Sequence, residues 1–83
     1  MYVYDNVQLI QMLLEQISAD VKIDSVNLVG EQGQVLFGLR EMITLGLISG
    51  AYRYSEDSDP IGPTLSSALG ILLTKRGLIF SER

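Results

Sequence analysis

The sequence predicts a small α+β domain in which helices pack against a two-stranded hairpin. Apolar residues recur at helical spacing over 6–18 and again over 31–45. A segment rich in turn-forming residues, 55–63, then separates two apolar runs that suit strands, and a short final helix follows. The order is therefore helix, short strand, helix, helix, hairpin, helix. This is the order of a winged helix: a three-helix core, a hairpin called the wing, and a short C-terminal helix. The alternative is a plain α+β domain with an unattached hairpin.

Length and composition limit the domain organisation. The chain has 83 residues, of which 47% are hydrophobic and 19% charged, as expected for one ordered domain over 1–83. A chain of this size buries only roughly 60–65% of its unfolded surface. It has no cysteine for a disulfide. A partner, such as a second copy of the chain, would therefore add useful stability.

The first helix is expected over about 6–18, with Asp5 and Asn6 as N-cap residues. Its apolar face consists of Val7, Ile10, Leu14 and Ile17. The alternating segment 21–24 predicts a very short strand. Asp24 and Ser25 then suit the cap of a short helix over 26–29, which Gly30 interrupts.

The next helix is expected over about 31–45, and Gly46 follows as a left-handed C-terminal cap. Its buried face is expected to hold Val35, Leu36, Leu39, Met42 and Ile43. The opposite, solvent-facing side is expected to carry Gln34, Phe37, Arg40, Glu41 and Thr44. Phe37 is unusual there, because its neighbours are polar.

The hairpin is less clearly specified. A first strand is expected over 47–54, followed by a long turn-rich tip over 55–63. The stretch 64–73 has both helical spacing and an apolar run that suits a returning strand, and we favour a strand near 69–73. Thr74 then caps a final helix from Lys75 to about Glu82.

The second half of the chain resembles the YjcQ-like family of small winged-helix proteins from phages and prophages. Three segments carry the resemblance: Leu45-Gly-Leu-Ile48, where the long helix meets the first wing strand; the hairpin Ser49 to Asp57; and Leu73-Thr-Lys-Arg-Gly77, which is similar to the family's step into the last helix. The resemblance covers about residues 31–83. It implies a winged-helix fold in which the third helix and the wing are the contact surfaces, and it implies no chemistry.

The charges differ from those of a winged helix that reads DNA. The net charge is −4, and Arg40 is the only base on the expected contact helix. The hairpin tip carries Glu56, Asp57 and Asp59, which would repel phosphates. Lys75 and Arg76 form a basic pair at the start of the last helix, the end at which positive charge is unfavourable.

Several functional classes lack support. The chain has neither histidine nor cysteine, so the common nucleophile pairs and metal ligands are missing. The acidic run 56–59 lacks the spacing of a calcium loop, and no phosphate-binding glycine motif is present. We therefore expect no enzyme, no cofactor, no metal and no small-molecule substrate. Without a signal peptide or a long apolar segment, we expect a cytoplasmic protein that does not enter a membrane.

Two functions remain. The first is a phage-type transcriptional regulator that binds DNA through Gln34, Arg40 and Thr44, with Lys75 and Arg76 on phosphates. The second is an acidic module for protein binding or homodimer formation. Its interface is expected to contain Phe37, Glu41, Tyr52 and Tyr54. Phe37 is alternatively part of the packing, covered by the short second helix or by the N-terminal segment with Tyr2, Val3 and Tyr4.

Overall fold

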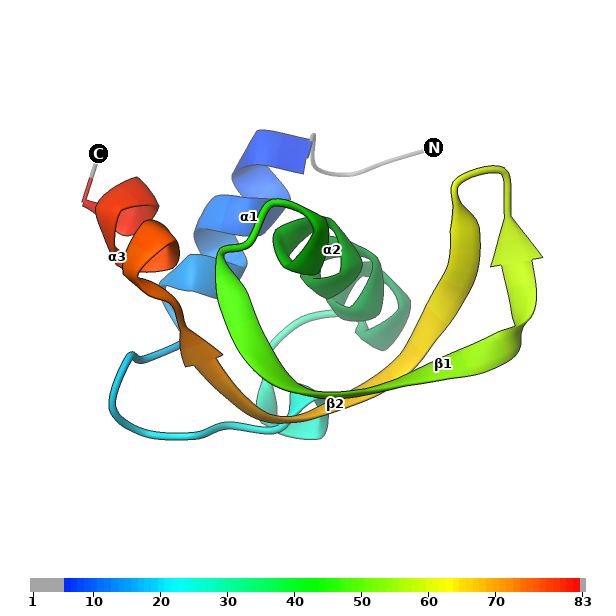
Figure 1. The fold of residues 1–83 in the computed structure, drawn as a ribbon, viewed down its shortest axis with the longest axis horizontal. Coiled ribbons are helices and arrows are strands. Elements are labelled where there is room, and N and C mark those ends of the chain that lie inside the picture. The colour runs from blue at the N-terminus through cyan, green and yellow to red at the C-terminus, as the bar shows by residue number, and fades with distance from the viewer. Residues whose placement is uncertain (1–5, 83) are drawn as a thin grey trace.

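The computed structural model describes residues 6–82, which form an α+β structure with a layout compatible with a winged helix (Figure 1). Two helices, α1 (Asn6–Leu14) and α2 (Gln32–Thr44), are followed by an antiparallel hairpin of β1 (Ile48–Asp59) and β2 (Gly62–Leu73). A 3₁₀ turn, η1 (Ser25–Asn27), precedes α2, and α3 (Lys75–Ser81) follows the hairpin. The hairpin curves beneath α2, and its turn and α3 lie at opposite ends of the molecule.

Helix α1 packs across α2 where α2 has a glycine. A Cβ at Gly38 would lie 2.6 Å from Cδ1 of Leu13, so the two helices approach too closely for a larger residue. α1 ends at Leu14, four residues earlier than predicted. The chain turns there because the Gln16 side chain exchanges two hydrogen bonds with the backbone of Val29, at 2.6 and 3.1 Å. The capping predicted for Asp5 and Asn6 falls outside the described side chains.

Helix α2 confirms the predicted segment within one residue at each end. Glu31 caps its start by accepting a hydrogen bond from the backbone N–H of Gln34 at 2.7 Å. Gly46 ends it with a φ of 75°, which a residue with a side chain rarely adopts. The predicted solvent face is wrong for Arg40, which is only 8% exposed.

The hairpin is longer than predicted, because the expected loop 55–63 is mostly strand. β1 continues to Asp59, and only residues 60 and 61 separate it from β2. The turn-forming residues form a bulge instead: between the pairs Tyr54–Leu65 and Ser58–Pro63, β1 has three residues and β2 has one. The strand predicted over 69–73 is confirmed and starts earlier, at Gly62, so the helical alternative for 64–73 is wrong.

The outer edge of β2 is covered by the segment before α2. One backbone bridge joins Ile23 to Ile71, at the site of the predicted short strand. Beyond it, the Ser25 hydroxyl accepts from the N–H of Ala68 at 3.1 Å, and the Asp24 carboxylate accepts from the N–H of Gly70 at 2.9 Å. Asp24 makes no side-chain cap to η1, so the cap predicted there is wrong. The helix predicted over 26–29 is the 3₁₀ turn at 25–27.

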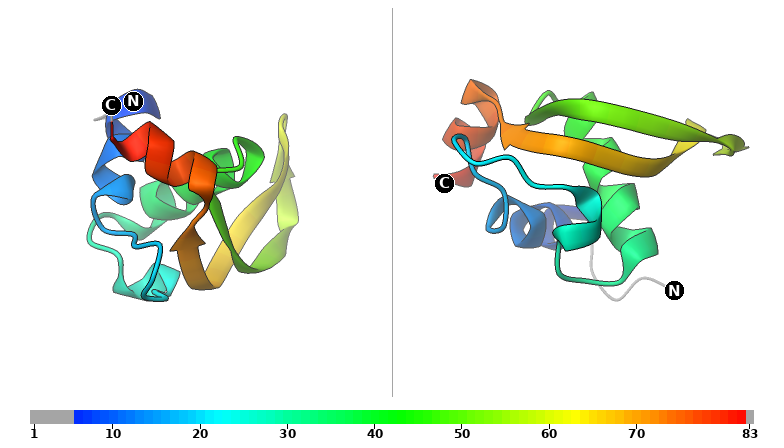
Figure 2. Two further views of the ribbon diagram at one scale, coloured as in Figure 1. Left: turned by 60° about the vertical axis from the view of Figure 1, so that its left-hand side comes forward. Right: turned by 90° about the horizontal axis from the view of Figure 1, so that it is seen from below.

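The core lies between α1, α2 and the concave side of the hairpin (Figure 2). Its largest fully buried side chains are Leu13, Val35, Leu39, Met42, Leu47, Ile71 and Ser25. Helix α3 lies outside this core. Thr74 caps it as predicted, accepting from the N–H of Gly77 at 3.0 Å. Gly77 is its only buried residue.

Candidate functional site

The guanidinium of Arg40 binds the turn of the hairpin to α2. Its two terminal nitrogens donate to the two oxygens of Asp59 at 3.2 and 2.6 Å. One of them also donates to the carbonyl oxygens of Gly62 at 3.4 Å and Pro63 at 3.1 Å. We call this group, Arg40 with Asp59 and the two carbonyls, the clamp. It is the only ion pair between residues of the described range 6–82.

Both charges of the clamp are stabilised in their ionised forms. The hydrogen bond from Arg40 lowers the pKa of Asp59, and the backbone N–H groups of Ile61 and Gly62 contribute in the same direction. The same contact raises the pKa of Arg40. A carboxylate held ionised by a bidentate guanidinium is a poor general acid or base, so the clamp is a structural contact.

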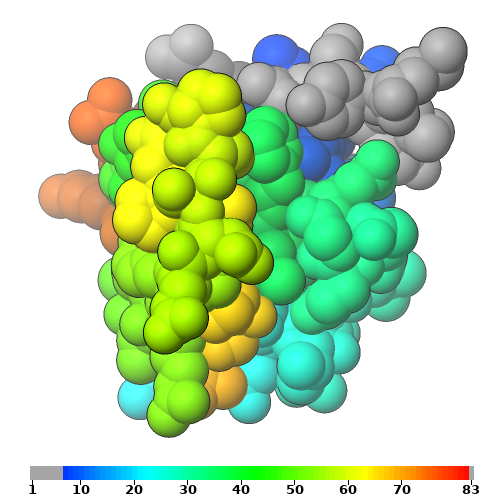
Figure 3. Space-filling view, turned by 90° about the vertical axis from the view of Figure 1, so that its right-hand side faces the viewer, coloured from blue at the N-terminus to red at the C-terminus, as the bar shows by residue number. Residues whose placement is uncertain are grey.

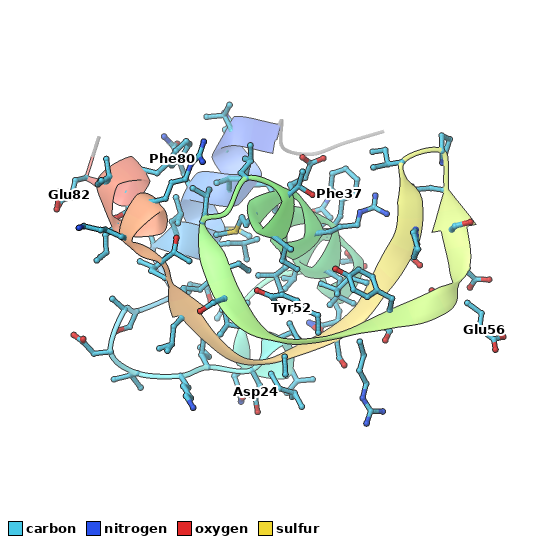
Figure 4. The ribbon with its side chains drawn as sticks, in the orientation of Figure 1. Asp24, Phe37, Tyr52, Glu56, Phe80 and Glu82 are labelled. Atoms are coloured by element: carbon cyan, nitrogen blue, oxygen red, sulfur yellow. The ribbon has the colours of Figure 1, made fainter. Side chains whose placement is uncertain are left out.

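Phe37 lies beside the clamp, between α2 and the hairpin (Figure 4). The guanidinium carbon of Arg40 is 5.6 Å from the centre of the Phe37 ring, within the range of a cation–π contact. Phe37 is half-buried and packs against the core. The ring therefore helps to position Arg40, and Phe37 is also accessible enough to contact a partner.

Two shallow grooves flank the clamp. Figure 3 shows the face on which the hairpin lies beside α2. One, of about 240 Å³, is lined by Gly33, Leu36, Phe37, Arg40, Asp59, Thr64 and Leu65. The other, of about 270 Å³, is lined by Arg40, Thr44, Tyr54, Ile61, Gly62 and Pro63. Ile61 is 71% exposed and Tyr54 50% exposed. We call Phe37, Thr44, Tyr54, Ile61 and Pro63 the α2–hairpin surface.

The predicted site residues on α2 have different environments. Gln34 and Glu41 are half-buried, and Thr44 is exposed. The Thr44 hydroxyl donates to the carbonyl oxygen of Arg40 at 3.1 Å. Arg40 is engaged by the clamp, so of these residues only Gln34, Glu41 and Thr44 offer polar groups toward solvent.

The two tyrosines of β1 also differ. Tyr52 is half-buried on the concave side of the hairpin, and its hydroxyl donates to the carbonyl oxygen of Ile48 at 3.3 Å (Figure 4). Burial raises its pKa. Tyr54 is exposed at the second groove, so only Tyr54 belongs to the α2–hairpin surface.

Lys75 and Arg76 are exposed at the start of α3, and the Arg76 side chain passes beside Gly46. Figure 1 places α3 at the end of the molecule opposite the hairpin turn. The structure therefore does not join Arg40, Lys75 and Arg76 into one positive strip. The N-terminal cover predicted for Phe37 falls on residues outside the described range.

Sequence reasoning missed two features of this site. Asp59 was assigned to a repelling acidic tip, yet its charge is neutralised by a residue of α2. Ile61 belongs to the segment 55–63 that is predicted as a turn-rich tip, although it is the most exposed large hydrophobic side chain of the α2–hairpin surface. The sequence Asp59-Pro-Ile-Gly62 contains a usable signal, because an aspartate often accepts from the N–H two residues later, as it does here at 2.9 Å.

Other site types have no support within residues 6–82. No group of three or more acidic, histidine or cysteine side chains there is arranged to hold a metal ion. None of the described helices is long and apolar enough to cross a membrane. No family model, curated protein or solved structure matches the chain. The resemblance to the YjcQ-like family thus stays a prediction.

Proposed function

We propose that this chain is a non-enzymatic winged-helix domain that binds a protein partner through the α2–hairpin surface. The clamp is the observation that carries the proposal. Arg40 is the only base on α2, and both of its terminal nitrogens already donate to the hairpin. The helix that would read DNA in a winged helix thus presents no free cation to phosphates.

The surroundings of the clamp favour a protein ligand. Tyr54 and Ile61 expose apolar area beside two grooves, and aromatic and large aliphatic residues are typical anchors of protein interfaces. Glu41 is near enough to stabilise the charge of Arg40, and Glu56 and Asp57 are exposed on the same hairpin. The partner that fits is a peptide or protein surface with a large apolar side chain flanked by lysine or arginine.

The clamp also makes this surface rigid. It fixes the hairpin turn against α2, so the exposed groups of the two elements keep their relative positions before a partner arrives. A preorganised surface loses less conformational entropy on binding. The two grooves beside the clamp therefore act as one binding surface.

A displayed library of random peptides tests the proposal. Selection on the immobilised protein should enrich sequences that combine leucine, phenylalanine or tryptophan with lysine or arginine. Ile61→Ser should weaken the binding of a selected peptide about tenfold, since truncating an interface anchor commonly costs that much. Val21→Ser is the matched control, because Val21 is also exposed but lies in the loop before η1, away from the hairpin turn.

Two results would contradict the proposal. One is a peptide that binds wild type, Ile61→Ser and Val21→Ser equally. The other is saturable binding of a mixed-sequence DNA duplex at low salt that weakens steeply as salt is added, which is the behaviour of phosphate contacts. The second result would restore the regulator hypothesis, with Lys75 and Arg76 as the bases to replace next.

A further inference from the structure

Helix α3 exposes more apolar side chain than any other short element of the described chain. Leu78, Ile79 and Phe80 are 40%, 57% and 37% exposed, and Gly77 is the only buried residue of the helix. Gly77 packs closely on the backbone of Leu47, whereas the three large apolar side chains after it stay partly exposed. Apolar groups gathered on one surface element mark a contact with another molecule.

The charges of α3 are ordered along its axis. Lys75 and Arg76 occupy its first turn, and Glu82 is its C-terminal cap residue. Positive charge at a helix N-terminus and negative charge at its C-terminus both oppose the helix dipole. None of the three is ion-paired with another described residue. Among the described residues, the Lys75–Arg76 pair therefore lies at the end of α3 where positive charge is unfavourable and without a negative partner.

A second copy of the chain would place opposite charges beside the ends of α3. If two α3 helices pack antiparallel across a two-fold axis, the start of each lies beside the end of the other. Lys75 and Arg76 then face Glu82 of the partner copy, twice, by symmetry. Leu78, Ile79 and Phe80 pack between the two charged ends. The apolar centre and the polar rim are the usual arrangement of a protein interface.

The neighbouring surface of α1 completes the contact. A groove of about 490 Å³ between the two helices is lined by Gln11, Leu14, Glu15, Phe80 and Ser81. Figure 4 shows Phe80 directed toward α1, at the end opposite the hairpin turn. Ile79 precedes Phe80 on α3 and is 57% exposed, so α3 contributes both an exposed apolar side chain and one wall of the groove, and a two-fold contact can use both. Val7, one turn before Gln11 on α1, adds a 59% exposed side chain.

We propose that the chain forms a homodimer through α3 and the adjoining face of α1. The two α2–hairpin surfaces then lie at the far ends of the dimer, so both remain available for binding. A specific interface buries about 800 Å² on each partner, more than a seven-residue helix supplies, which is why the α1 face must take part. The proposal is independent of what the α2–hairpin surface binds.

Charge exchange between two variants tests the antiparallel pairing. The variants are Glu82→Lys and the double substitution Lys75→Glu with Arg76→Glu. Each alone brings like charges together across the two-fold axis, so each should dimerise about tenfold more weakly than wild type in sedimentation equilibrium. Mixed in equal amounts, they should form a heterodimer of near wild-type affinity, since both charged contacts are then attractive.

With these variants, a loss of dimerisation can be distinguished from a loss of folding. Each places on α3 the charges that its dipole favours, so a loss of dimer does not come from a weakened helix. Ile79→Ser should also weaken the dimer about tenfold through its apolar centre. Val26→Ser is the control, because Val26 is 72% exposed on η1 and lies outside the proposed interface.

The proposal fails on either of two results. The first is a wild type that stays monomeric at every concentration used in sedimentation equilibrium. Alternatively, the wild type forms a dimer that neither charge variant weakens, and the mixture shows no preference for the heterodimer. The second result would assign self-association to a surface other than α3.

Discussion

At the residue scale, the clamp explains how a partly exposed carboxylate comes to shape the hairpin turn. Asp59 accepts from Arg40 and also from the N–H groups of Ile61 and Gly62, at 2.9 and 3.2 Å. One side chain thus sets the turn conformation and attaches it to α2. The substitution Asp59→Asn would keep a side-chain oxygen that accepts hydrogen bonds in the turn, but it would remove the negative charge that faces Arg40.

This arrangement predicts a pH dependence. The pKa of Asp59 is lowered in the folded state from its ordinary 3.8, so the stability it contributes is complete above about pH 5 and is lost as pH falls through the folded pKa. Urea unfolding between about pH 6 and about pH 2.5, which spans the ordinary value of 3.8, should therefore show a smaller acid-induced loss of stability in Asp59→Asn than in wild type. Equal slopes in both proteins would mean that the ion pair contributes nothing to folding.

Ser25 gives a second prediction at this scale. Its hydroxyl is 1% exposed and is the acceptor for the backbone N–H of Ala68, which is fully buried. Ser25→Ala leaves that donor without a partner, and an unsatisfied buried group costs about 1–3 kcal/mol. The free energy of unfolding in urea should fall by that amount. Ser66→Ala is the control, because the Ser66 hydroxyl is exposed; an equal loss there would contradict the argument.

At the scale of elements, α3 is attached through a glycine. A Cβ at Gly77 would overlap the carbonyl oxygen of Leu47, which is backbone and cannot move aside easily. Gly77→Ala should therefore lower the free energy of unfolding by about 2 kcal/mol despite alanine's better helix propensity. Gly33→Ala is the control, because the flexible carboxylate of Glu31 is what a Cβ would meet there. The argument is wrong if both substitutions have the same effect in thermal unfolding.

The elements also differ in how far the sequence predicted them. α2 and the cap of α3 were predicted well, because their signals are local: helical spacing, a terminal glycine and a threonine N-cap. The hairpin was underestimated because serine and aspartate act inside β1, where the Ser55 hydroxyl lies 2.6 Å from that of Thr64 across the bulge. Turn-forming residues do not show in advance whether they form a loop or a bulge.

The candidate site depends on contacts between residues that are far apart in the sequence. Arg40 and Asp59 are 19 residues apart, and their pairing requires both the end of α2 and the full length of β1. Helical periodicity placed Arg40 on the polar face because it could not include the hairpin that covers it. The exposed apolar side of α3 was missed for a related reason: a seven-residue helix is too short for periodicity to separate a buried face from an exposed one.

At the scale of the whole molecule, small size connects folding to association. A chain of 83 residues has a small core, and a dimer adds buried apolar surface that the monomer lacks. If folded chains pair and unfolded chains do not, each tenfold increase in concentration above the dissociation constant adds about 1.4 kcal/mol per mole of dimer to the free energy of unfolding. The Tm of the wild type should then rise with protein concentration. Glu82→Lys should show the same rise only at about tenfold higher concentration, because its dimer is expected to be about tenfold weaker, and Val26→Ser should behave like wild type. A wild-type Tm that does not change with concentration would show that folding gains nothing from a second copy, and the exposed side of α3 would need a different partner.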